Sequence, residues 1–243
     1  MSQREHRPWA MPRRPWLMRM NWEYLAFAHW RVKPEVMRRL VPEALEMDLF
    51  DGTAWIGVVP FEMTGVRAHG SPGIPPTNRF LELNLRTYVV KNGRPGVFFF
   101  SLDAECWLAV RAARLGFHLP YFDADMDMSI GDDIAYRSRR THRGAKDGSL
   151  RAIYQPEDAT FLSKPGSLEH WLTERYCLYS ARTDGALFRG EVHHRQWPLQ
   201  RARMEIRENS LGDLIGLELG SPPASVLFSR RVEVVAWNPV RVG

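Results

Sequence analysis

One short stretch of the chain carries four polar side chains at the spacing of a β-strand. Within residues 80–90, Glu82, Asn84, Arg86 and Tyr88 alternate with apolar or β-branched residues. This two-residue period predicts a strand with one polar face. An arginine can hold a carboxylate through two parallel hydrogen bonds, and a glutamate or tyrosine can move a proton or orient a carbonyl. The polar face therefore has the groups needed to fix and process a small polar ligand.

The surroundings of this face decide its role, and the residues alone leave two alternatives open. On an open antiparallel sheet the face would meet water, whereas in a closed sheet it would line a cavity. A buried face has a further interpretation without chemistry, in which Glu82 neutralises Arg31 or Arg86 as part of a structural ion-pair network.

Most of the remaining chain also reads as strands. The sequence Lys91-Asn-Gly-Arg-Pro-Gly96 predicts a hairpin that pairs residues 80–90 antiparallel with residues 97–103. Short helices are predicted after Pro34, over residues 108–115 and from Ser167. Further strands are predicted over residues 23–30, 54–62, 134–138, 150–154, 176–181, 186–194, 202–206 and 226–237. This pattern indicates one mostly antiparallel β domain with a few short helices, either a barrel or a sandwich.

Composition is that of an ordinary globular protein. The 243 residues are 44% hydrophobic and 25% charged, which is enough apolar material for a sizeable core. No apolar run approaches the roughly 20 residues that span a bilayer, and the first residues lack the apolar segment of a signal peptide. We expect a cytoplasmic protein with a basic tail over residues 1–20 and one domain over residues 21–240.

The formal net charge of +5 raises the question of a nucleic-acid partner. Much of it comes from the tail, and a second basic cluster lies in a stretch that also contains Gly144 and Gly148. The cluster has tyrosines only at its edges, without the motif or stacking aromatics of most nucleic-acid binders. A solvated loop is the favoured interpretation, and nucleic-acid binding a weaker one. The basic residues of the cluster are Arg137, Arg139, Arg140, Arg143, Lys146 and Arg151.

Several familiar cofactor and metal sites are excluded by spacing. The chain has no glycine-rich phosphate loop, no G-x-S-x-G elbow and no H-E-x-x-H pair. The acids at positions 123, 125 and 127 begin like a calcium loop, but Met128 and Ile134 replace its glycine and glutamate. Cys106 and Cys177 lack metal-ligand spacing and read as small buried hydrophobes. No cofactor and no metal are expected.

Longer motifs resemble a known superfamily. Residues 24–45 contain a strand that ends in arginine, a Pro-Glu helix start and a Val-Pro-Glu turn, and they look like the opening of acetoacetate decarboxylase-like proteins. Five further segments are similar to an uncharacterised, YqjF-like branch of that superfamily: residues 51–61, 82–89, 96–104, 113–121 and 174–179. The resemblance implies a cone-like closed β-sheet with an internal cavity, and thus that the Glu82 face lines the cavity.

The same resemblance assigns roles and exposes a departure. By motif position Arg31 and Glu82 match an arginine and a glutamate that surround the Schiff-base lysine of the decarboxylases, but Tyr121 stands where that lysine should be. A Schiff-base lysine needs burial or neighbouring cations to lower its pKa. The four lysines of the chain fall in predicted turns or loops: Lys33, Lys91, Lys146 and Lys164. Decarboxylation through a Schiff base is therefore not expected.

The sequence leads to one functional hypothesis and one rival. The hypothesis is that an internal cavity binds a small carboxylate or oxo-acid, with lysine-independent acid–base chemistry such as enolisation or hydration. The rival is a non-enzymatic ligand sensor or partner-binding scaffold that has lost the ancestral activity; self-association stays open in both. The expected catalytic residues are Glu82 and Tyr121, and the expected ligand-binding residues are Arg31, Asn84, Arg86 and Tyr176.

Overall fold

The computed structural model describes residues 3–182, 184–220 and 222–243, and it is built mainly of β-strands. Three short α-helices and one 3-10 turn complete it: α1 (Pro34–Arg38), α2 (Trp107–Phe117), α3 (Leu168–Thr173) and η1 (Gly212–Ile215). The strands are β1 (Met18–Val32), β2 (Glu46–Met47), β3 (Ala54–Ala68), β4 (Arg79–Lys91), β5 (Arg94–Ala104), β6 (Tyr121–Ile130), β7 (Ile134–Arg140), β8 (Ser149–Pro156), β9 (Cys177–Ala181), β10 (Leu187–His194), β11 (Gln200–Asn209), β12 (Ser225–Ala236) and β13 (Val240–Arg241).

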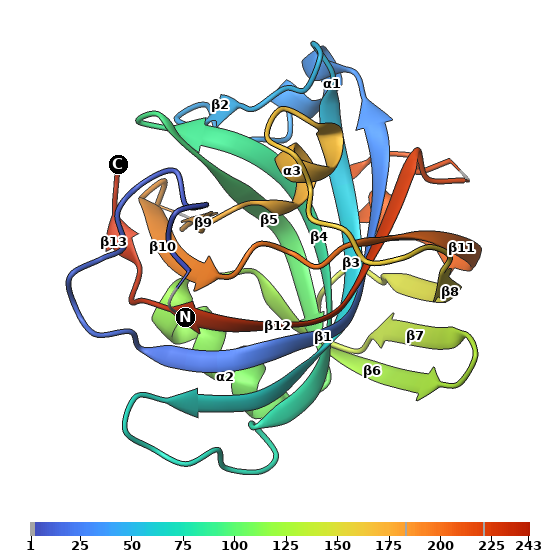
Figure 1. The fold of residues 1–243 in the computed structure, drawn as a ribbon, viewed down its shortest axis with the longest axis horizontal. Helices are drawn as coiled ribbons and strands as arrows, with labels where there is room; N and C mark the ends of the chain where they lie inside the picture. Colours follow the sequence, from blue (N-terminus) through green and yellow to red (C-terminus); the bar gives the residue numbers. More distant parts are fainter. Residues whose placement is uncertain (1–2, 183, 221) are drawn as a thin grey trace.

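Nine of these strands form a closed barrel, which confirms the predicted fold class. The predicted hairpin is present, since β4 pairs antiparallel with β5 over the Lys91–Arg94 turn. That same pairing closes the ring, whose order is β5-β6-β7-β8-β11-β12-β1-β3-β4. Figure 1 shows the strands wrapping around a common interior.

Two more strands close a second, smaller ring on the other side of the same sheet. Strand β9 pairs with β5, β10 pairs with β9, and β10 also pairs with β12. The smaller ring therefore runs β12-β1-β3-β4-β5-β9-β10, and it shares the sheet β12-β1-β3-β4-β5 with the barrel. Because side chains alternate across a strand, each shared strand contributes residues to two separate cores. On β4, Leu83 belongs to the core of the barrel, whereas Phe80 belongs to the core of the smaller ring.

The helices lie where strands change direction. Helix α2 connects β5 to β6, which form a parallel pair that needs a crossover. Helix α3 precedes β9, and its Ser167 cap accepts a hydrogen bond from the His170 backbone N–H. Figure 1 shows α3 and α2 well apart, toward opposite ends of the molecule. In the described part of the chain, no helix is long and apolar enough to cross a membrane.

The segment before β1 packs onto the body rather than hanging free. Arg7 is buried and its guanidinium contacts the Glu191 carboxylate of β10 at 2.5 Å. Strand β1 begins at Met18, within the stretch predicted as tail, because Met18 pairs with Ala236 of β12. Residues 1–2 of that stretch lie outside the described residues.

The second basic cluster corrects the prediction of a solvated loop. Its first half lies on β7, where Arg137 contacts Asp125 of β6 at 2.9 Å. Arg140 is buried and donates to the Asp103 carboxylate at 2.6 and 2.9 Å. The prediction counts only the acids that are close to the cluster in sequence. Strand pairing brings a second set, the acids on β6, opposite the arginines of β7. Much of the apparent basic patch is therefore internally neutralised.

Candidate functional site

The smaller ring encloses a cavity of about 400 Å³. Its walls come from the shared sheet and from β9 and β10, and α2 closes one side. Apolar side chains dominate the lining, and the polar ones are few. The buried polar residues on the wall are Glu82, Asn84, Tyr121, Thr173, Arg175 and His194, with the half-buried Arg86 beside them.

Strand β4 supplies three of these polar groups because of its alternation. Glu82, Asn84 and Arg86 face the cavity, whereas the intervening leucines pack into the barrel core. The structure thus places this face on a cavity wall and not in open solvent. Tyr88, the next residue on that face, lies behind the cavity, where its hydroxyl donates to the Leu172 carbonyl at 2.9 Å.

Glu82 sits in a nearly dry environment. Glu82 is only 2% exposed. One of its carboxyl oxygens accepts a hydrogen bond from the Tyr121 hydroxyl at 2.8 Å. Burial raises the pKa of Glu82 to about 8, although hydrogen bonds from Tyr121 and Asn84 oppose the shift. No arginine is within ion-pair distance of Glu82 in the described residues, so the closed Glu82–Arg86 pair is not formed. At neutral pH the carboxyl is therefore mostly protonated.

Tyr121 begins β6 at the exit of the α2 crossover and is buried. Burial, together with the nearby Glu82, raises its pKa well above 10. The phenol therefore stays protonated and serves as a permanent hydrogen-bond donor to Glu82. This arrangement couples a carboxyl group with a near-neutral pKa to a fixed donor, which is suitable for proton transfer.

The hydrogen-bond acceptors next to the Arg86 guanidinium are neutral groups. Its Nη2 lies 3.5 Å from the Tyr88 hydroxyl and 3.4 Å from the Leu172 carbonyl, and its buried Nε has no hydrogen-bond partner. The guanidinium also lies over the Phe27 ring, 5.4 Å from its centroid. These contacts hold the cation in place but provide no negative charge.

A second cationic group, which the sequence pattern did not reveal, lies next to Arg86. Arg175 is buried, contacts the Asp48 carboxylate at 2.5 Å and donates from Nε to the Trp171 carbonyl at 2.6 Å. Its Nη2 has no partner. Burial and the neighbouring Arg86 both lower the pKa of Arg175, while Asp48 raises it. Arg86 and Arg175 thus both line the cavity, and each guanidinium keeps one buried nitrogen without a hydrogen-bond partner.

The buried Asn84 Oδ1 is also unpartnered. In a folded protein such groups normally find a partner. One wall of the cavity therefore contains an unpartnered acceptor at Asn84 and unpartnered donors at Arg86 and Arg175.

Two expected binding residues lie away from the cavity wall. Arg31 is exposed at the end of β1, where its guanidinium lies 5.1 Å from the centroid of the Trp55 ring. Tyr176 is buried, but its hydroxyl donates to Glu174 and its ring stacks on His194. In this extended segment Thr173, Arg175 and Cys177 face the cavity, so Tyr176 points the other way. Alternation places Arg175 and Tyr176 on opposite faces of this segment, but it does not say which of the two faces meets the cavity.

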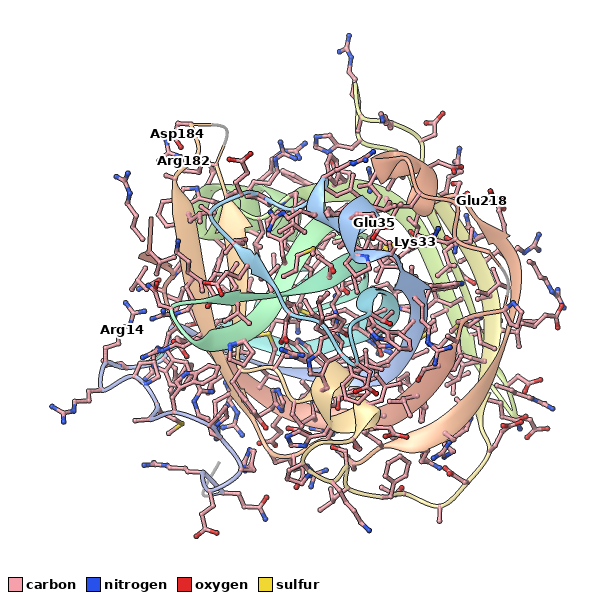
Figure 2. The ribbon with its side chains drawn as sticks, turned by 90° about the horizontal axis from the view of Figure 1, so that it is seen from above. Arg14, Lys33, Glu35, Arg182, Asp184 and Glu218 are labelled. Carbon is pink, nitrogen blue, oxygen red and sulfur yellow. The ribbon has the colours of Figure 1, made fainter. Side chains whose placement is uncertain are left out.

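All four lysines lie in the described part of the chain, and none reaches the cavity wall. Figure 2 labels Lys33 beside Glu35 at the start of α1, and Lys33 is exposed. Lys91 donates to the Ala44 carbonyl at 2.8 Å. Lys146 and Lys164 are exposed. Among the described residues no group of three His, Cys, Asp or Glu side chains is placed to hold a metal ion.

Comparison with known proteins matches this architecture. Among solved structures, MppR complexed with pyruvate, described as an enduracididine biosynthesis enzyme, superposes with a TM-score of 0.63 at 15% identity, over 96% of this chain and 93% of that one. Acetoacetate decarboxylase from Legionella pneumophila gives a TM-score of 0.62 at 13% identity, over 100% and 98%. These similarities establish the acetoacetate decarboxylase-like fold.

Sequence comparison gives the family. The uncharacterized protein YqjF of Bacillus subtilis (strain 168) is 43% identical over 233 residues, which cover 96% of this chain and 95% of the relative. Residues 19–233 match the family model DUF2071, described as an uncharacterized conserved protein. The chain therefore belongs to the DUF2071 family, with an acetoacetate decarboxylase-like fold.

Proposed function

We propose that the cavity binds a small organic acid or oxo-acid whose carboxylate lies between Arg86 and Arg175. The observation that carries this proposal is the pair of neighbouring arginines on the cavity wall, each of which has a buried nitrogen without a hydrogen-bond partner. Keeping a second cation in a desolvated site costs free energy, and a bound anion would offset that cost. Planar guanidinium donors also match the geometry of a carboxylate.

The remaining polar groups suit the chemistry of an oxo-acid. Asn84 orients the oxo group, and Glu82 acts as base and acid at the carbon next to it. The ionised Glu82 removes a proton from that carbon, and the electron pair of the broken C–H bond forms the enolate. Return of the proton from Glu82 to the carbon restores the oxo-acid and leaves Glu82 ionised again. Tyr121 positions the carboxyl group through its 2.8 Å hydrogen bond. A pKa of about 8 suits such a role near neutral pH.

The neighbouring structures support the choice of ligand class. MppR, which shares the fold, is described as a complex with pyruvate, itself an oxo-acid. The chemistry proposed here does not use a Schiff base, since the lysines of this chain lie outside the cavity. We also propose a reducing, cytoplasmic location, which suits the free and buried Cys106 and Cys177.

Native mass spectrometry of protein freshly purified under reducing conditions tests binding directly, because a co-purified acid adds its own mass. Titration calorimetry with pyruvate and acetoacetate then compares the wild type with Arg86→Met. We expect binding to the wild type and at least tenfold weaker binding to the variant, since one of two charge-assisted contacts is lost. Arg139→Met, which changes an exposed arginine on β7, is the matched control and should bind as the wild type does. Equal affinity of Arg86→Met and the wild type would refute the assignment.

The chemistry has a separate test. In D2O, proton NMR of a bound oxo-acid should show exchange of the hydrogens next to the oxo group, and Glu82→Gln should abolish exchange while retaining binding. Exchange should accelerate as the pH rises through about 8, because the ionised carboxylate is the base. Binding without exchange would favour the non-enzymatic sensor or scaffold.

A further inference from the structure

The cavity is longer and more apolar than a small acid requires. Its buried polar groups gather toward one end, whereas Arg67, Ser71 and Thr77 at the other end are exposed or half-buried. Its volume of about 400 Å³ is in the range that accommodates drug-sized ligands. We infer that the ligand is an amphipathic acid, with its carboxylate at Arg86 and Arg175 and an apolar tail directed toward the opposite end. This inference rests on the proposed function and narrows its ligand class.

The strand register gives the direction of the cavity. Along the β3–β4 pair, Gly57 lies opposite Arg86 and Met63 lies opposite Phe80. The Arg86 end is covered by α3, whose Leu172 carbonyl lies 3.4 Å from the guanidinium. Phe80 is six residues earlier on β4, which corresponds to about 20 Å of strand. A ligand anchored at Arg86 therefore has a long wall beside it.

Beyond Glu82 that wall becomes apolar. Most side chains there are methionine or phenylalanine, and they come from β1, β3, β4 and α2. Methionine side chains adapt to ligands of different shape, so this region suits an alkyl or aryl chain. The residues concerned are Met20, Met63, Phe80, Ala113 and Phe117.

The apolar end also carries the opening to solvent. Several residues both line the cavity and are exposed, and they lie at the end of β3, on the β3–β4 connection and on α2: Arg67, Ala68, Pro72, Ile74 and Ala112. Ile74 is 63% exposed, which is unusual for a side chain of its size. Apart from Arg67, these rim residues are apolar, so they let the tail of a ligand pass and keep it partly covered. It is of little use to an acid as small as pyruvate.

Arg67 offers a reversed orientation, in which the carboxylate would stay at the mouth. The free donors of Arg175 favour the inner position, because that residue is only 7% exposed and its Nη2 has no partner. Arg67 is exposed and can be solvated by water. Binding an anion at Arg175 is therefore more favourable in free energy than binding it at Arg67.

Calorimetry with the series butanoate, hexanoate, octanoate and decanoate, and with decanol as an uncharged analogue, tests the inference. Each added methylene that is buried should lower Kd about fourfold, so decanoate should bind about two orders of magnitude more tightly than hexanoate. Ala113→Phe, which fills the outer part of the cavity, should abolish this gain and leave butanoate binding unchanged. Leu115→Phe, on the outer face of α2 and 80% exposed, is the matched control.

The outcomes separate the two proposals. Equal affinity for all four acids, lost in Arg86→Met, would overturn the apolar tail and leave acid binding intact. Decanol binding as tightly as decanoate, with neither affected by Arg86→Met, would overturn the proposed function. A larger loss of decanoate affinity in Arg67→Ala than in Arg86→Met would reverse the orientation and refute this inference. Absence of binding by every acid would refute both proposals.

Discussion

Glu82→Gln is the sharpest test of the site, because the buried carboxyl makes stability depend on pH. Folding raises the pKa of Glu82 from 4.5 to about 8. The folded state therefore holds this proton more tightly than the unfolded chain, and the associated stability is complete below about pH 4.5. It is lost as the pH rises toward 8 and the buried carboxylate becomes charged. Between pH 6 and pH 8, one group with these two pKa values removes about 2 kcal/mol from the free energy of unfolding.

Urea denaturation at pH 6 and pH 8 measures the effect. The amide introduced by Glu82→Gln has no titratable proton, and its oxygen can still accept the Tyr121 hydrogen bond. The free energy of unfolding of Glu82→Gln, relative to wild type, should rise by about 2 kcal/mol between the two pH values. Glu46→Gln removes an exposed carboxyl on β2 and should follow the wild type. If all three proteins showed the same pH dependence, Glu82 would not titrate between pH 6 and pH 8 in the folded protein, and both its raised pKa and the predicted acceleration of exchange near pH 8 would be refuted.

Three further predictions concern the cations. Arg86→Met should leave the free energy of unfolding unchanged or raise it by about 1 kcal/mol in urea melts, because the lost cation has no carboxylate partner; a loss of several kcal/mol would show that it is structural. Treatment with acetoacetate and borohydride should leave the four lysines unmodified by mass spectrometry, because none reaches the cavity, and a reduced adduct would restore the decarboxylase hypothesis. Arg140→Met should cost about 3–5 kcal/mol because it strands the buried Asp103, whereas Arg139→Met, at an exposed pair, should cost less than about 1 kcal/mol; equal losses in urea melts would contradict this distinction.

The sequence predicts the strand β4 and its polar face because alternation is a local property. The same reasoning predicts the β4–β5 hairpin from Asn92 and Gly93, which both have positive φ angles. It also predicts that the site has no lysine, because the sequence has Tyr121 at the position where the resembling decarboxylases have their Schiff-base lysine.

Other parts of the site depend on contacts that no local pattern reveals. Arg175 follows α3 in a short extended segment, and its partner Asp48 lies more than a hundred residues earlier. The sequence-based hypothesis chooses Tyr176 instead. Which face of this segment meets the cavity depends on where β9 joins the smaller ring, and that is not a local property of the sequence. The neutralisation of Arg137 by Asp125 likewise requires the register of β6 against β7.

The sheet shared by the two rings constrains how this family can diversify. On β4, odd-numbered leucines belong to one interior and even-numbered polar residues to another. A deletion or insertion of a single residue would exchange the two sets and place Glu82 and Arg86 in the barrel core. Ligand preference is therefore free to change by substitution at alternate positions, while length changes are confined to the connections. In protein engineering terms, β4 is a strand on which selectivity can be redesigned at even positions with the odd positions left as scaffold.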